Sequence, residues 1–268
     1  MSRPGMTLYI EAVGCCAPGL DGWTQAQPVL RGERAHLPTE LSSHPPQRLP
    51  AIERRRSPLA VRLAFAVAED ALSASTLRPD ALATVFASSD GDTHIVHRLC
   101  LALAQPQRVV SPTDFHNSVH NSAAGYWSIA AGARLTSTSL SARHASFAAG
   151  LLEASALVQA EDRDCLLVAF DVGPPAILLA ACGTSQTAAV ALILTPRRQP
   201  GSLAALHLQT IAQCAETAMA DPALERLRRS NPAARALPLL VHLARREPAT
   251  VLLDGAGGHS LHLELQVP

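Results

Sequence analysis

Short apolar runs alternate with longer amphipathic stretches along most of the chain. Apolar runs of strand length predict buried strands, and the last stretch alternates as a half-buried strand does. The predicted strands are Leu8–Gly14, Ala83–Ser88, Leu135–Ala142, Cys165–Asp171, Ala188–Leu194, Leu203–Ile211, Thr250–Leu253 and a final strand with Leu261, Leu263 and Leu265 on one face. Helical spacing predicts helices at Trp23–Leu30, Pro58–Leu72 with Ser57 as N-cap, Thr93–Leu103, Asn117 to about Gly132, about Ala145 to Gln159, Pro222–Arg229 and Pro232–Arg246. This alternation predicts a layered α/β fold with a mostly parallel or mixed sheet.

One strand is unusual because it is polar on one face. The strand Leu135–Ala142 is rich in Ser and Thr and leads directly into a helix of small apolar residues. Such a strand fits the edge of a sheet, where it could pair with another chain. Strand-to-helix turns of this layout often carry a nucleophile, yet the residues at the turn are Arg143 and His144.

Composition narrows the classes of function. The formal net charge of the 268 residues is zero, so no global field attracts nucleic acid or an anionic membrane. The sequence contains no Lys, which excludes a lysine Schiff base and a Walker-type phosphate loop. Aromatic residues make up only 3%, so the core must be built from Ala, Leu and Val, which suits closely layered elements.

The cysteines and the chain start indicate a cytoplasmic protein. The six cysteines lack metal-site spacing, no secretory signal is recognisable, and no apolar run reaches the length of a membrane span. We therefore expect reduced thiols, no metal and no disulfide.

Two motifs could suggest metal binding. His116 and His120 have i, i+4 spacing, but the residue after the first His is Asn117 and not the Glu of a metalloprotease. A hydrogen-bonding structural pair is therefore favoured over a zinc site. Asp90–His94 resembles the start of a calcium loop without its closing Glu, so a strand-to-helix turn is favoured.

Polar residues near the turn could bind or react. Ser141 and Ser146 are possible nucleophiles, but no orienting carboxylate is in view. Arg143 lies at the positive end of a helix, where it could bind an anion or pair internally. The stretch "GAGGHS" contains Gly255, Gly257 and Gly258 and predicts a tight hairpin turn, whose amides could also line a pocket.

Several stretches together resemble a known family. They are "LYIEAVGCCAPGLDGW", "FHNSVHNSAAGYWSIAAGARLTSTSLSA" and "GAGGHSLHLEL", of which "HNSAAGYWSIAAG" is the most specific. They are similar to the thiolase-fold β-ketoacyl synthases, and specifically to the small synthase-like group that includes chain length factors. The resemblance implies a thiolase-like layered αβα fold with a mixed sheet. It also implies that residues 1–212 form a largely kept N-terminal α/β region, while residues 213–268 are a reduced C-terminal region of the same globular unit.

The departures from this family concern its chemistry. By resemblance, the nucleophilic Cys falls at Arg143, give or take one residue, and the two C-terminal histidine motifs of the synthases are absent. A Claisen condensation needs a thiolate to hold the acyl chain, and a guanidinium cannot do this. The resemblance therefore implies a subunit without catalytic residues or a cofactor of its own.

The family pattern also implies partners. Cysteine-less members pair with a catalytic β-ketoacyl synthase and work with an acyl carrier protein, here for a polyketide, fatty-acyl or aryl polyene product. The strand before the turn would pair antiparallel across the dimer, and the helix Asn121–Gly132 would lie beside the partner's acyl tunnel. Bulky side chains there would limit chain length because an overpacked acyl chain costs about 1–3 kcal/mol. The candidate tunnel or interface residues are Asn121, Tyr126, Trp127, Thr136, Thr138, Leu140, Ser141 and Phe147.

The same residues allow other interpretations. Tyr126 and Trp127 could equally fill the subunit's own core. The chain could be an acyl hydrolase or acyltransferase that uses Ser141, Ser146 or a cysteine. It could also be a structural homodimer with a vestigial pocket.

Overall fold

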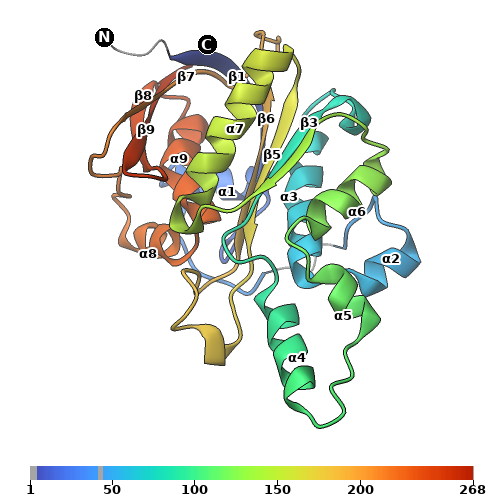
Figure 1. The fold of residues 1–268 in the computed structure, drawn as a ribbon. Coiled ribbons are helices and arrows are strands. Elements are labelled where there is room, and N and C mark those ends of the chain that lie inside the picture. Colours follow the sequence, from blue (N-terminus) through green and yellow to red (C-terminus); the bar gives the residue numbers. More distant parts are fainter. Residues whose placement is uncertain (1–4, 42–44, 268) are drawn as a thin grey trace.

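One mixed sheet runs through the whole fold. The computed structural model describes residues 5–41 and 45–267. The strands are β1 (Met6–Ala17), β2 (Leu20–Asp21), β3 (Ala83–Ala87), β4 (Ser137–Leu140), β5 (Cys165–Asp171), β6 (Ala188–Thr195), β7 (Ala204–Ala212), β8 (Ala249–Asp254) and β9 (His259–Gln266). They are ordered β4-β3-β5-β6-β1-β7-β9-β8, with β2 paired to β1 (Figure 1). β4, β3 and β5 are parallel, and the pairings from β5 to β8 are antiparallel.

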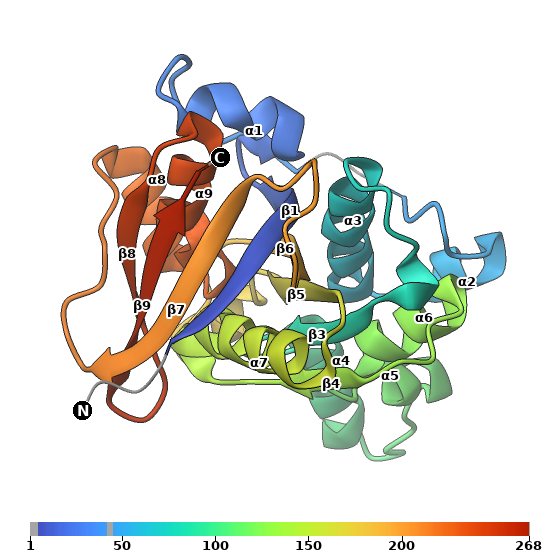
Figure 2. The ribbon, with the colours of Figure 1, turned by 90° about the horizontal axis from the view of Figure 1, so that it is seen from above.

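Helices cover both faces of this sheet. They are α1 (Trp23–Leu30), α2 (Ala51–Arg56), α3 (Leu59–Ser73), α4 (Thr93–Ala104), α5 (Pro112–Asn117), α6 (Ser122–Ala131), α7 (Ser146–Glu161), α8 (Pro222–Ser230) and α9 (Leu237–Arg245). Within the described residues, 3₁₀ segments lie in the connections between elements, at Pro79–Ala81, Arg143–Ala145, Ala176–Leu178 and Ala233–Ala236. α3 and α6 lie on one side of the strands β5, β6 and β1, and α7 lies on the other (Figure 2). The predicted layered α/β architecture is therefore confirmed.

The layers can approach closely because small residues stand at the contacts. A Cβ atom on Gly150 of α7 would lie 2.8 Å from the Cβ of Ala87 in β3. A Cβ atom on Gly14 of β1 would lie 2.0 Å from the carbonyl oxygen of Val67 in α3. Both distances are too short for a side chain, so glycine is required at these two crossings. This explains how a chain poor in aromatic residues builds two dense cores, one on each side of the sheet.

The C-terminal hairpin extends the same sheet. β9 pairs with β7 along its whole length, and Leu261, Leu263 and Leu265 all face the core shared with α7 and α9. The predicted alternation of the last strand is thereby confirmed. Across residues 5–41 and 45–267, every helix is too short or too polar to cross a membrane.

Several predicted boundaries are wrong for local reasons. Ser57 does not cap a helix, because its hydroxyl donates to the Arg54 carbonyl at 2.9 Å and ends α2, a helix that the pattern did not reveal. The helix predicted from Asn117 is two helices, since α5 ends at that residue and α6 starts at Ser122. The helix predicted from Pro232 begins as the 3₁₀ segment Ala233–Ala236. The strand predicted over Leu135–Ala142 is ordered as a strand only at Ser137–Leu140.

Candidate functional site

The strand–helix junction, residues 141–145 between β4 and α7, has a strained backbone. β4 is the edge strand next to β3, as its polar face predicted. Arg143 has a φ of 53°, in the left-handed region that an L side chain rarely adopts. The Ser146 hydroxyl holds this turn by donating to the Arg143 carbonyl at 2.6 Å and accepting from the Ala142 amide at 3.1 Å. Strain at such a turn is typical of functional sites.

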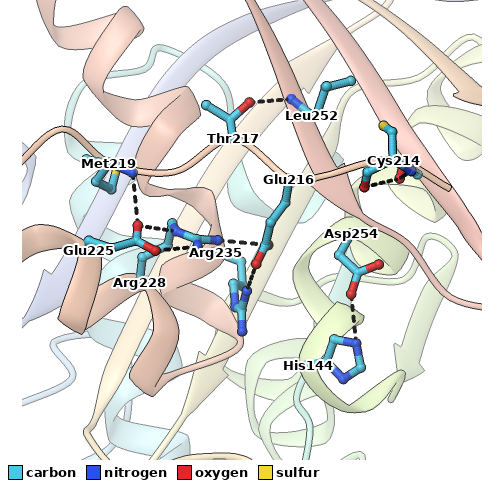
Figure 3. Close-up of polar contacts among 11 residues, drawn as sticks. His144, Cys214, Glu216, Thr217, Met219, Glu225, Arg228, Arg235, Leu252 and Asp254 are labelled. Atoms are coloured by element: carbon cyan, nitrogen blue, oxygen red, sulfur yellow. Dashed lines mark hydrogen bonds and ion pairs between the residues drawn. The ribbon is translucent and has the colours of Figure 1, made fainter.

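The side chains at this turn are cationic or potentially cationic. Arg143 and His144 are both exposed. His144 Nε2 lies 2.9 Å from Asp254 Oδ2, at the end of β8, and Figure 3 shows this contact joining two distant parts of the chain. Because the pair is partly exposed, we expect it to contribute less than about 1 kcal/mol. The contact links the junction to the C-terminal hairpin.

The glycine-rich turn of that hairpin is confirmed. Gly257 and Gly258 have φ values of 72° and 76° between β8 and β9. The Gly255 amide donates to the His259 carbonyl at 3.0 Å, and a Cβ on Gly255 would lie 2.7 Å from that oxygen. Only glycine fits these positions without strain.

The hydroxyl groups around the junction are engaged in structure. The Ser141 hydroxyl donates to the Ser89 carbonyl at 2.8 Å. Thr136 and Thr138 donate to carboxylates of α7, at 2.8 Å and 3.2 Å respectively. Neither Ser141 nor Ser146 is hydrogen-bonded to a general base within the described residues. The geometry thus favours anchoring of β4 over nucleophilic attack.

A buried carboxyl group lies behind the junction, and sequence reasoning missed it. Asp171 ends β5, and its Oδ1 accepts from the Ser88 hydroxyl at 2.8 Å and from the Ser89 and Asp90 amides at 2.8 Å and 3.3 Å. Its Oδ2 has no partner within residues 5–41 and 45–267. Burial raises the pKa of Asp171 to about 7, against the lowering effect of the three donors. The only sequence signal was an acidic residue directly after a buried strand.

The two histidines of the "FHNSVHN" stretch do not share a helix face. His116 lies in α5, where it packs edge to face on Tyr126 with 6.2 Å between ring centroids. His120 follows the end of α5, and its Nε2 lies 3.0 Å from the Ser88 carbonyl. In the part of the chain that the structure describes, no group of three or more ligating side chains could hold a metal ion. Asp92 caps α4 by accepting from the Ile95 amide, which confirms the strand-to-helix turn in that region.

The candidate tunnel residues separate into two groups. Tyr126 and Asn121 line an apolar groove of about 670 Å³ along α6. Trp127 is fully buried and packs edge to face on Phe65 of α3, and Phe147 is fully buried on the opposite side of the sheet. Both rings fill the subunit's own core. For Trp127 this is the alternative interpretation given above, whereas Tyr126 lies at the groove. Leu140 is partly buried against the same core as Phe147.

The buried cysteines are inert thiols. Burial raises the pKa of Cys16 and of Cys165 to about 12 and also raises that of Cys15. A thiol is a nucleophile only as its thiolate, so these groups are unsuited to acyl transfer. Cys100 is exposed on α4, while Cys182 and Cys214 are half-buried in loops, so no cysteine occupies the junction.

An irregular segment, residues 213–220, crosses the C-terminal hairpin and is held by a buried ion network (Figure 3). The Arg228 side chain is only 4% exposed and contacts Glu216 at 2.8 Å and Glu225 at 2.7 Å. The hydrogen bonds from Arg228 lower the pKa of Glu225 to about 2. Burial alone would raise the pKa of Glu216, but hydrogen bonds from Arg228 and Arg235 outweigh it and lower the pKa. The network therefore keeps both carboxylates charged.

The same segment covers the edge of β8. The Thr217 amide donates to the Leu252 carbonyl at 2.8 Å, and the Leu252 amide donates to the Thr217 hydroxyl at 2.9 Å. Thr217 thus hydrogen-bonds to both the amide and the carbonyl of Leu252 at the outer edge of β8. The Ser260 hydroxyl fixes the start of the segment by accepting from the Cys214 amide at 3.0 Å.

Comparisons with known proteins agree with this architecture. The family model described as β-ketoacyl synthase, N-terminal domain, matches residues 23–252. A search of curated proteins finds no match. Among solved structures, the ketosynthase ApeO in complex with its chain length factor ApeC, from Xenorhabdus doucetiae, is similar at 26% identity and a TM-score of 0.72. That match covers 96% of this chain and 99% of the matched chain.

Two more distant structures share the fold. The ishigamide ketosynthase/chain length factor matches at 13% identity with a TM-score of 0.75, over 97% of this chain and 99% of the other. The type II polyketide synthase complex AntDE:AntF, an acyl-carrier protein with its ketosynthase bound to the hexaketide, matches at 12% identity and a TM-score of 0.76. The coverage is 98% of this chain and 100% of the matched one.

Proposed function

Because the chain belongs to the β-ketoacyl synthase family, we propose that it is a chain-length-factor-like subunit without condensing activity. It pairs with a catalytic β-ketoacyl synthase and shapes the space into which the partner's acyl chain grows. The complex works with an acyl carrier protein in the cytoplasm, in a pathway of the polyketide, fatty-acyl or aryl polyene type.

The proposal rests on one observation, the presence of Arg143 at the strand–helix junction. Arg143 has a φ of 53° in the turn between β4 and α7. The resemblance to the synthases assigns their nucleophilic Cys to this position, give or take one residue. A guanidinium cannot hold an acyl group as a thioester, and the neighbouring His144 is paired with Asp254. A condensing cycle that begins with acyl loading on this chain therefore has no acceptor atom at its usual place.

Exposed apolar side chains support an obligate partner. α4 projects from the body of the protein together with α5 (Figure 1), and the segment from α4 to α6 carries several exposed apolar side chains. Exposed apolar patches of this kind mark protein–protein interaction sites. The exposed apolar residues of this surface are Val96, Leu101, Leu103, Phe115, Val119 and Ile129. Ile129 is 85% exposed and lines the groove beside Tyr126. A partner seated here would cover the groove and turn it into an enclosed space.

A second candidate function finds less support in the geometry. An acyl hydrolase would need a hydroxyl hydrogen-bonded to a general base. Ser141 and Ser146 instead donate to backbone carbonyls. A homodimer remains the outcome that competes most directly, because the same apolar surface could meet a second copy of this chain.

Loading and condensation assays test the catalytic part of the proposal. The purified chain, its candidate synthase partner and the mixture are incubated with a radiolabelled acyl carrier protein and analysed for covalently bound label and for product. We expect label and product only where the synthase is present. Label on this chain alone would refute the proposal. A mixture in which Arg143→Ala condenses as well as the wild type would confirm that Arg143 performs no chemistry.

A matched pair of substitutions tests the partner surface. Ile129→Asp places a charge on α6 at the groove, and Ile177→Asp places one at a similarly exposed apolar position, 85% against 74%, in the 3₁₀ segment away from the groove. Co-purification with the synthase should be lost for the first variant and kept for the second. Equal retention of both variants would contradict the assigned surface, and a stable homodimer of the wild type that excludes the synthase would favour the competing function.

A further inference from the structure

A second pocket, separate from the junction and the groove, is lined by arginines. It has a volume of about 350 Å³ and is lined by residues of α2, the first turn of α3, α4 and α5. Arg56, Arg62 and Arg98 line it from three different helices. We call it the arginine pocket. None of its lining residues belongs to the strand–helix junction.

The cationic groups of this pocket have spare capacity to donate. Neither Arg56 nor Arg62 has a carboxylate partner within the described residues. Arg98 contacts Asp114 through Nε and Nη2, at 3.1 Å and 2.7 Å, which leaves its Nη1 group. The lining also contains Asp92 and Asp114, so three guanidiniums stand against two carboxylates, and the excess of one positive charge favours an anion.

The first turn of α3 adds to this preference. Its N-cap residue, Pro58, makes no side-chain cap bond, and the turn contains no acidic residue. Pro58 and Leu59 line the pocket, so the positive end of a 15-residue helix faces the same space as the guanidiniums.

The pocket also presents a buried acceptor that lacks a donor. Asn117 lines it and is only 3% exposed. Its Nδ2 donates to the Thr113 carbonyl at 3.0 Å, whereas its Oδ1 has no partner among the described residues. A buried acceptor without a partner costs about 1–3 kcal/mol. A ligand that is anionic and also carries a proton would satisfy both the guanidiniums and this oxygen.

We infer that the arginine pocket binds a phosphate monoester or inorganic phosphate. The monoanion of such a group offers two unprotonated terminal oxygens to the arginines and a P–OH donor to Asn117. Sulfate and a carboxylate carry no such proton near neutral pH, and a phosphodiester has none either. The amide oxygen therefore selects the protonated phosphate among anions of similar charge.

Calorimetric titration of the full chain tests this site. The probes are inorganic phosphate, glycerol phosphate, sulfate and a phosphodiester, all at pH 6.5 and constant ionic strength. We expect saturable binding of the first two and at least about tenfold weaker binding of the last two. Arg62→Gln and Arg98→Gln should weaken phosphate binding about tenfold or more. Arg55→Gln is the matched control, since Arg55 is an exposed neighbour that does not line the pocket.

A separate variant tests the preference for phosphate over sulfate. Asn117→Leu should reduce the preference for phosphate over sulfate, and its folding is verified first by circular dichroism. Arg62→Gln is an exposed change, so it keeps the test decisive if Asn117→Leu does not fold. Equal binding of phosphate and sulfate by the wild type, no saturable binding, or the same loss for Arg55→Gln as for Arg62→Gln would overturn the assignment.

Discussion

Replacement of Asp171 by Asn probes the buried carboxyl group behind the junction. Asn keeps the shape of the side chain and an oxygen that accepts from Ser88, Ser89 and Asp90. It removes the charge that Asp171 acquires when it loses its proton. The substitution therefore separates hydrogen bonding, which is kept, from ionisation, which is lost.

The size of the effect follows from the pKa. Burial raises the pKa of Asp171 from 3.8 to about 7. The difference of about 3 units, at 1.36 kcal/mol each, gives an upper limit of about 4 kcal/mol. Between about pH 4 and pH 7 the unfolded chain has lost this proton and the folded chain keeps it. The unfolded state then binds fewer protons, so the free energy of unfolding falls as the pH rises through this window and levels off above it.

Urea unfolding measured by circular dichroism, from about pH 4 to pH 8, tests this reasoning. The wild type should lose stability across the window, and Asp171→Asn should not show that loss. At about pH 8 the variant should exceed the wild type by up to about 4 kcal/mol, and near pH 4 the two should be similar. Glu40→Gln, at an exposed loop position, is the control for a general charge effect. A variant that is less stable than the wild type at the higher pH would refute the assignment of a destabilising buried charge.

Other changes have distinct expected results. Trp127→Ala should cost about 3–5 kcal/mol in the free energy of unfolding of the isolated chain because it empties a core site. Tyr126→Ala should lower the free energy of unfolding by about 1 kcal/mol or less, but it should lengthen the product of the synthase complex. Equal losses of stability for Trp127→Ala and Tyr126→Ala would contradict the assignment of Trp127 to the core and of Tyr126 to the groove. Arg228→Met should cost about 3–5 kcal/mol in urea unfolding, because two carboxylates lose their buried partner. A double-mutant cycle of His144→Ala and Asp254→Asn should give a coupling below about 1 kcal/mol, and a larger coupling would mean that the pair is more shielded than its exposure indicates.

The sequence predicted the elements well where a local pattern determines them. The buried strand at Cys165–Asp171 was predicted with its correct bounds, because a continuous apolar run is a strong local signal. The hairpin turn at residues 255–258 followed from glycine chemistry alone. The predicted start of α3 was wrong because the Ser57 hydroxyl ends the preceding helix. A serine that ends one helix and a serine that begins the next cannot be distinguished from the sequence alone.

The site was less predictable because its contacts are distant in the chain. The donors to Asp171 come from residues about eighty positions earlier. Which of Tyr126 and Trp127 faces the groove depends on how α6 packs on α3, and a helix that is apolar on most sides does not reveal this. The left-handed backbone of Arg143 is set by the turn that Ser146 holds, and no residue preference signals it.

The two ends of the sheet differ in a way that governs how copies could assemble. At β8, Thr217 occupies the outward amide and carbonyl groups of Leu252, whereas β4, at the opposite end, carries no further strand within the described residues. A protein open at both ends could add chain after chain and polymerise, but one that is capped at one end can join only a single neighbour edge to edge. Strand addition at β4 would therefore end in a closed pair and would not propagate into a fibre.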